Sequence, residues 1–111
     1  MNNTITTVHL GGRLNKPVSQ VLFLQSEVNY THIHLKNGEH HIVATTLKEL
    51  EKRLGSYGFW RCNKSNLVNL AAVKILKNDG VVKIRNFEPI RISRRRKMEL
   101  PQVLDAIDGT L

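Results

Sequence analysis

Apolar and polar residues alternate with a period of two along most of the chain, which is typical of β-strands that bury one face. This alternation predicts seven strands, over residues 5–10, 21–27, 30–36, 40–44, 73–77, 81–85 and 89–92. Helical spacing is confined to two shorter stretches. The sequence therefore predicts a mainly β fold.

Two dipeptides, Asn37-Gly38 and Asp79-Gly80, match type I′ turns, because such turns need positive φ at both central positions. Each is expected to close a two-residue hairpin. Pairing around the first turn puts His34 opposite His41. The face that this hairpin should bury comprises Ile33, Leu35, Ile42 and Ala44. The second hairpin should bury Val73, Ile75, Val82 and Ile84. Its outer face should be basic, with Lys74, Lys83 and Arg85.

One helix is predicted over about residues 47–54. Thr46 and Glu49 form the S/T-x-x-E capping box, and Gly55 stands where a left-handed residue ends a helix. A second, C-terminal helix is expected to begin near Ser93, with Pro101 kinking or restarting it. Its apolar positions at helical spacing are Leu100, Val103, Leu104 and Ile107.

The chain has 111 residues, which suits a single domain spanning 1–111 with its own hydrophobic core. None of its apolar runs approaches the ~20 residues that cross a bilayer, so we expect a cytoplasmic protein without membrane attachment. The one cysteine, Cys62, cannot form an internal disulfide and lies in the apolar run of residues 59–62. It is therefore predicted to be a buried structural residue rather than a nucleophile.

Basic residues outnumber acidic ones by 17 to 9, and the excess is concentrated in the second half of the chain. Residues 1–54 hold six basic and four acidic side chains, whereas residues 55–111 hold eleven and five, so the net charges are +2 and +6. A basic surface of this kind favours a polyanionic partner, because each neutralised phosphate releases counterions.

Two segments in the second half carry side chains that suit nucleic acids. Residues 91–97 contain five basic side chains and no acid, and Ser93 can cap a following helix whose first N–H groups bind anions. Arginine can grip a phosphate or a guanine edge with two hydrogen bonds. Residues 61–66, RCNKSN, supply amide, hydroxyl and ammonium groups for bases and phosphates, although ordinary turn chemistry explains this segment equally well.

These motifs together resemble the LytTR DNA-binding domain. Residues 58–70 read GFWRCNKSNLVNL and residues 90–96 read IRISRRR, which are similar to the family patterns F-x-R-x-x-x-S-x-x-V-N and I-x-[IV]-S-R-R-x. Residues 26–30, the Asn37-Gly38 turn and residues 46–51 also match in order and spacing. The resemblance covers about residues 5–105.

The resemblance implies an elongated three-layer β sandwich with one short internal helix and a C-terminal helix. Such domains are output modules of bacterial response regulators and insert loops into successive major grooves of double-stranded DNA. The implied base-reading residues are Asn29, Asn63, Lys64 and Arg94. The implied phosphate partners are Arg61, Ser65, Arg95, Arg96 and Lys97. Family members often carry a histidine where this chain has Asn63, so the base preference there stays open.

The same resemblance sets expectations about partners. Family members usually also carry an N-terminal receiver domain, which we do not expect here, so the chain should not accept a phosphoryl signal itself. The expected partner is double-stranded DNA, bound by a sequence-specific transcriptional regulator that needs no cofactor. A homodimer on repeated sites and a separate signalling protein are further candidate partners.

Other functions compete with this interpretation. His32, His34 and His41 share the outer face of the first predicted hairpin, but no carboxylate or thiolate joins them, so a metal site is not favoured. The scattered acids and the absence of a nucleophile motif argue against an enzyme. Single-stranded RNA binding needs exposed aromatic platforms, whereas Phe23, Phe59 and Trp60 lie in apolar runs typical of a core. RNA binding and a protein-interaction role such as an anti-activator both remain as alternatives.

Overall fold

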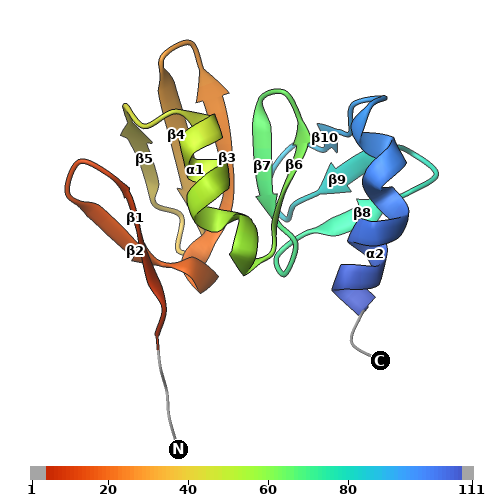
Figure 1. Cartoon of the computed structure of the whole chain (residues 1–111), viewed down its shortest axis with the longest axis horizontal. Helices are drawn as coiled ribbons and strands as arrows, with labels where there is room; N and C mark the ends of the chain where they lie inside the picture. Colours follow the sequence, from red (N-terminus) through yellow and green to blue (C-terminus); the bar gives the residue numbers. More distant parts are fainter. Residues whose placement is uncertain (1–4, 109–111) are drawn as a thin grey trace, which may run out of the picture.

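The structure is a computed structural model, and it describes residues 5–108. The described chain contains three antiparallel sheets and two α-helices (Figure 1). The first sheet pairs β1 (Thr7–Gly11) with β2 (Leu14–Pro17). The central sheet has the order β5-β4-β3-β7-β6, from β3 (Val21–Glu27), β4 (Tyr30–Leu35), β5 (His40–Val43), β6 (Phe59–Asn63) and β7 (Asn66–Asn69). The third has the order β10-β9-β8, from β8 (Lys74–Leu76), β9 (Val81–Lys83) and β10 (Ile90–Arg91).

The helices connect and cover these sheets. α1 (Leu47–Leu54) follows β5, and α2 (Leu100–Asp108) ends the described chain. Three short 3₁₀ segments complete the element order, η1 (Val18–Gln20), η2 (Gly55–Tyr57) and η3 (Arg96–Glu99). No helix within residues 5–108 has the length and apolar character needed to cross a membrane.

Two hydrophobic clusters separate the molecule into three layers. Consecutive residues of a central strand point to opposite faces, and both faces are apolar: Leu24 packs in one cluster and Phe23 in the other. The first cluster joins the central sheet to β1 and α1, and the second joins it to β9, β10 and α2. Figure 1 shows the β1–β2 and β8–β10 sheets on opposite sides of the central sheet. The predicted mainly β, three-layer fold with two short helices is confirmed.

Each of the seven predicted strands is present, but three further strands were missed. β6 and β7 lie in the second half of the central sheet, where both faces are covered, and all four residues of β7 are buried. A strand that is buried on both faces reads as a continuous apolar run rather than as an alternation. β2 is short and half-exposed, so its pattern is equally weak.

The first hairpin has a different register from the predicted one. Leu35 accepts a hydrogen bond from the Gly38 N–H and donates its own N–H to Glu39, so residues 36–38 form a three-residue loop with Gly38 at φ 90°. His34 therefore pairs with His40, not with His41. Because a slip of one residue turns a strand over, Ile42 is 58% exposed and Ala44 is also exposed. The predicted burial of Ile42 and Ala44 is wrong, whereas Ile33 and Leu35 are buried as expected.

The second hairpin also departs from a two-residue turn, but without turning its strands over. Ile75 pairs with Val82, and residues 77–80 form the loop, closed by a hydrogen bond from the Gly80 N–H to the Leu76 carbonyl. This register differs by two residues from the predicted one, and a shift of two keeps each side chain on its face. Val82 and Ile84 are buried, and the basic outer face is exposed as predicted, with Lys74, Lys83 and Arg85.

Helix α1 has the predicted bounds, and Thr46 Oγ1 caps it by accepting from the Glu49 N–H at 3.2 Å. Gly55 does not end the helix in a left-handed conformation; its φ is −57°, and the chain continues through η2 to Gly58, whose φ is 83°. α2 begins at Leu100 rather than near Ser93, with Pro101 in its first turn and η3 before it. The basic run of residues 91–97 thus precedes this helix.

Candidate nucleic-acid interface

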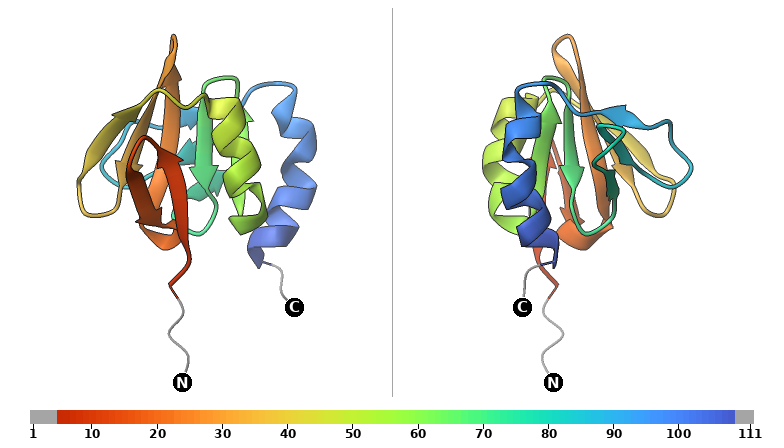
Figure 2. Two further views of the ribbon diagram at one scale, coloured as in Figure 1. Left: turned by 60° about the vertical axis from the view of Figure 1, so that its left-hand side comes forward. Right: turned by 90° about the vertical axis from the view of Figure 1, so that its right-hand side faces the viewer.

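Three connecting segments lie along one edge of the molecule. They are the β3–β4 turn at residues 28–29, the β6–β7 turn at residues 64–65, and the segment from Ile92 to Arg95 that leads from β10 to η3. Figures 1 and 2 show all three at the same end of the sheets, at the top of each view. A backbone hydrogen bond from Ser26 N–H to the Ser65 carbonyl, 2.9 Å long, ties the first segment to the second.

The β3–β4 turn carries strongly exposed side chains. Val28 is 92% exposed and has a φ of 51°, a conformation that β-branched residues rarely adopt. Asn29 beside it is exposed, as a base-reading residue must be, and Tyr30 is 55% exposed. Val28 lies between the strands predicted over residues 21–27 and 30–36, and Tyr30 lies on the strand face opposite to Ile33 and Leu35.

Asn63 organises the β6–β7 turn. Its Oδ1 accepts from the Ser65 backbone N–H at 2.8 Å and from Asn66 Nδ2 at 3.1 Å, and its Nδ2 donates to the Arg91 carbonyl at 2.7 Å. The amide thus holds the turn in shape and ties it to β10. Little of its hydrogen-bonding capacity is left for a base.

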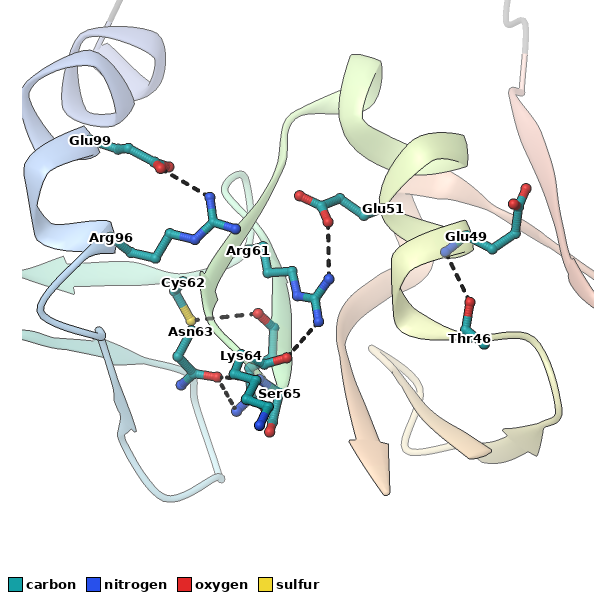
Figure 3. Close-up of polar contacts among 11 residues, drawn as sticks. Thr46, Glu49, Glu51, Arg61, Cys62, Asn63, Lys64, Ser65, Arg96 and Glu99 are labelled. Carbon is teal, nitrogen blue, oxygen red and sulfur yellow. Dashed lines mark hydrogen bonds and ion pairs between the residues drawn. The ribbon is translucent and has the colours of Figure 1, made fainter. Parts of the chain in front are cut away.

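Arg61 braces the same turn from the other side (Figure 3). Its Nη1 lies 3.1 Å from Glu51 Oε1 on α1, and its Nη2 donates to the Lys64 carbonyl at 2.6 Å. The Arg61 side chain is 19% exposed, and its Nε is buried without a partner. The guanidinium therefore lies between the helix and the turn rather than at the surface. The sequence had given no reason to single out Glu51.

The basic run of residues 91–97 is bound to β6 through a backbone hydrogen bond of its own. Ser93 N–H donates to the Cys62 carbonyl at 3.0 Å, and Ser93 Oγ accepts from the Arg96 N–H at 3.2 Å. Arg96 pairs with Glu99 at 2.9 Å, and Glu99 also accepts from Trp60 Nε1 at 2.8 Å. The Trp60 hydrogen bond and Arg96 hold the pKa of the Glu99 carboxyl below its usual value.

Four cations of the interface stay exposed and form no ion pair within residues 5–108: Lys64, Arg94, Arg95 and Lys97. Lys97 lies over the backbone of Gly80. A Cβ added to Gly80 would lie 2.9 Å from the Cε and Nζ atoms of Lys97. The structure thus divides the predicted site residues into two groups. Asn29, Lys64, Arg94 and Arg95 offer exposed side chains, whereas Asn63, Arg61 and Arg96 are bound within the protein.

Cys62 lies in the second hydrophobic cluster, fully buried. Burial raises the pKa of its thiol to about 11, so the thiolate that a nucleophile needs is scarce at neutral pH. This environment agrees with the predicted structural role.

Three of the histidines, His32, His34 and His40, stack together on the face of the central sheet that also carries Phe23. His32 Nδ1 lies 2.7 Å from His40 Nε2, and the other ring nitrogen of His32 lies 2.6 Å from Glu27 Oε1. His41 points to the opposite face, where its Nε2 lies 2.8 Å from Glu39. Among the described residues no group of three or more His, Cys, Asp or Glu side chains has the arrangement of a metal site.

Comparison with known proteins agrees with this architecture. The family model described as the LytTr DNA-binding domain matches residues 12–105. Among solved structures, the chain is similar to the LytTr DNA-binding domain of a Bacillus cereus protein described as a response regulator, with a TM-score of 0.72. That alignment has 21% sequence identity and covers 93% of this chain and 98% of the other, which supports the fold. No curated protein matches the chain.

Proposed function

Because this chain belongs to the LytTR DNA-binding domain family, we propose that it is a transcriptional regulator that recognises a specific double-stranded DNA sequence through loops. The proposed interface is the edge formed by the β3–β4 turn, the β6–β7 turn and the segment before η3. The protein acts by binding and catalyses no reaction. Its loops enter the major groove, where each base pair presents a distinct hydrogen-bonding pattern.

One observation carries this proposal: exposed cations and an exposed amide from three separate loops meet along a single edge. Phosphate contacts position a protein on DNA, and side chains that reach base edges supply specificity. We assign base reading to Asn29, Lys64 and Arg94. We assign phosphate contacts to Arg95, Lys97 and the Ser65 hydroxyl.

Three residues of the family motifs receive a supporting role in this proposal. Asn63 shapes the β6–β7 turn, since its amide is already bonded on both atoms. Arg61 and Arg96 are paired with Glu51 and Glu99, so they hold the edge together instead of adding phosphate contacts.

The experiment is selection from random duplexes followed by fluorescence anisotropy with the selected and a scrambled duplex. We expect the selected duplex to bind at least ~10³-fold more tightly than the scrambled one. Arg94→Ala should cost about 1–3 kcal/mol on the selected duplex and relax its preference at one position. Lys97→Ala, a matched loss of one exposed charge, should weaken both duplexes alike. Equal losses on both duplexes for Arg94→Ala would remove Arg94 from the base-reading group.

A further inference from the structure

A hollow of about 410 Å³ lies between the central sheet and the segment that joins β9 to β10. Its sheet side comes from β3, β4 and β7, where Phe23 pairs with His34 and Gln25 pairs with Asn66. Residues 87–91 form its other side, and Asn63 also lines it. Sites for small molecules usually enclose ~300–1,000 Å³, so the hollow has a suitable size.

Asn66 lines this hollow and holds, beneath its surface, a hydrogen-bond acceptor of fixed orientation. Asn66 is 8% exposed, its Nδ2 donates to Asn63 Oδ1 at 3.1 Å, and its own Oδ1 has no partner. The amide cannot be turned over, because Asn63 Oδ1 also accepts from the Ser65 N–H while Asn63 Nδ2 donates to the Arg91 carbonyl. A buried acceptor left without a donor is costly. An occupant that brings a donor would remove this cost.

His34 supplies a second unpartnered atom, its buried Nε2. Its ring stacks between Phe23, at a centroid distance of 4.4 Å, and His40, at 4.6 Å. Burial, with help from the nearby His40 and His32, lowers the pKa of His34 to about 4. The ring is therefore neutral at neutral pH, and its Nε2 can either donate or accept. An uncharged occupant suits this environment better than an anion.

Phe87 adds an aromatic wall at the rim. Its ring meets Phe23 edge-on at 5.0 Å and His34 at 5.3 Å, and the residue is 36% exposed. The rim also includes Arg91, which is exposed. The unpartnered atoms lie beneath the surface, so an occupant can reach them only if exposed side chains at the rim move.

We propose that this hollow binds a small, uncharged, planar heteroaromatic molecule, of the size of a nucleobase, whose hydrogen-bond donor is an exocyclic amino group. The donor meets Asn66 Oδ1, a second polar ring atom meets His34 Nε2, and the ring packs against Phe87. Binding at this site does not require DNA. The site nevertheless lies directly beside the β6–β7 turn, because Asn63 lines the hollow and also holds that turn in shape.

Adenine tests the proposal, followed by NMR on the isotope-labelled full chain. We expect saturable shifts at the Asn66 side-chain amide and the His34 ring. N6,N6-dimethyladenine, which keeps the ring and loses the exocyclic donor hydrogens, should bind at least tenfold more weakly. Absence of saturable shifts, which is the result if water alone fills the hollow, overturns the proposal. So do shifts confined to the exposed cations Lys64 and Arg94.

Two variants make the test specific to the hollow. Phe87→Ala removes an exposed ring and should leave the fold intact while weakening adenine binding several-fold. His34→Phe keeps the stacked ring and removes Nε2, and it should weaken adenine binding as well. Tyr57→Ala is the matched control, since Tyr57 is an exposed aromatic residue that does not line this hollow. Unchanged affinity of both hollow variants overturns the proposal. Because no DNA is present, this outcome is independent of DNA recognition.

Discussion

The shape of the β6–β7 turn depends on a charged residue of α1. Arg61 joins the Glu51 carboxylate to the Lys64 carbonyl, and it is largely buried between them. Lys64 is one of the proposed base-reading residues, and its backbone is held by this brace. An acidic side chain near a DNA-facing edge would ordinarily oppose binding, because it repels phosphates. Here we expect it to assist recognition through Arg61.

Replacing Glu51 with Gln separates these two effects. Gln still accepts a hydrogen bond from Arg61, but loss of the carboxylate charge should weaken this contact and loosen the turn, so affinity for the selected duplex should fall by up to about tenfold. Affinity for a scrambled duplex should stay the same or rise slightly. Asp105→Asn, which removes an exposed acid from α2, is the control. Tighter binding of Glu51→Gln to both duplexes, measured by anisotropy, would show that charge alone matters.

His34 should make stability depend on pH. Its pKa lies near 4 in the folded protein and near 6.5 when unfolded, chiefly because of burial, with the adjacent His40 and His32 contributing. Between these values the unfolded chain binds more protons, so stability should decline as pH falls from about 6.5 towards 4. His34→Phe should flatten this decline between pH 7 and pH 5 in urea unfolding. His9→Gln, a change at an exposed histidine, should leave it intact; an unchanged decline in His34→Phe would contradict the assignment.

Residue identities at the edge could be predicted from the motifs, but the direction of each side chain could not. Arg61 and Arg94 are both basic and both stand in family motifs, yet one is braced inside the protein and the other is exposed. The difference comes from Glu51, which lies ten positions away from Arg61 along the chain. No periodicity or spacing links these two residues, so only the folded arrangement reveals the pairing.

At the scale of elements, strands and helices were easier to predict than the turns between them. The dipeptides Asn37-Gly38 and Asp79-Gly80 correctly locate two hairpins, but both loops are longer than two residues. Loop length decides the register, and register decides which face of a strand is buried. This is why the face prediction failed for β5 and succeeded for β9. Residue type at a turn does not fix loop length, since Gly38 fits a left-handed position in a three-residue loop as readily as in a two-residue loop.

The end of α1 offers a paired test of backbone conformation. Gly55 has helical φ and open space around it, whereas Gly58 has a φ of 83°. Gly55→Ala should stabilise the protein by about 0.4–1 kcal/mol, because alanine loses less entropy on folding. Gly58→Ala should destabilise it by about 1–2 kcal/mol, because alanine resists the left-handed conformation. Urea unfolding of the two variants checks the opposite signs; equal signs would contradict the observed helix end.

At the scale of the whole molecule, the three layers bring the loops to one edge. β3 and β7 are neighbours in the central sheet, and β6 lies beside β7. Their turns therefore meet, although they are more than thirty residues apart in the sequence. The third layer adds the basic segment, which is fastened to β6 through Ser93. Alternation predicted the β class, but the place of β6 and β7 in the central sheet depends on packing on both faces, which alternation does not report.

The charge distribution of this edge predicts a specific salt dependence. Lys64, Arg91, Arg94, Arg95 and Lys97 are exposed, and none of them forms an ion pair within the described chain. On a scrambled duplex, where Lys64 and Arg94 have no cognate base to read, all five can neutralise phosphates, and the slope of log affinity against log salt should be about −4.5, at roughly −0.9 per phosphate. Arg61 and Arg96 are held by acids and should not contribute. Arg95→Ala should bring the slope to about −3.6, whereas Arg61→Lys should leave it unchanged.

Salt dependence alone would also suit RNA, so the same series needs single strands. The exposed aromatic residues of the described chain, Tyr30, Tyr57 and Phe87, lie on different elements and do not form the continuous stacking platform that single-stranded binders use. We therefore expect single-stranded DNA and RNA to bind no better than a scrambled duplex. Tyr30 adjoins Asn29 at the edge, so Tyr30→Ala should leave duplex preference intact. Tighter binding of single-stranded RNA than of every duplex, lost in Tyr30→Ala, would favour an RNA-binding function instead.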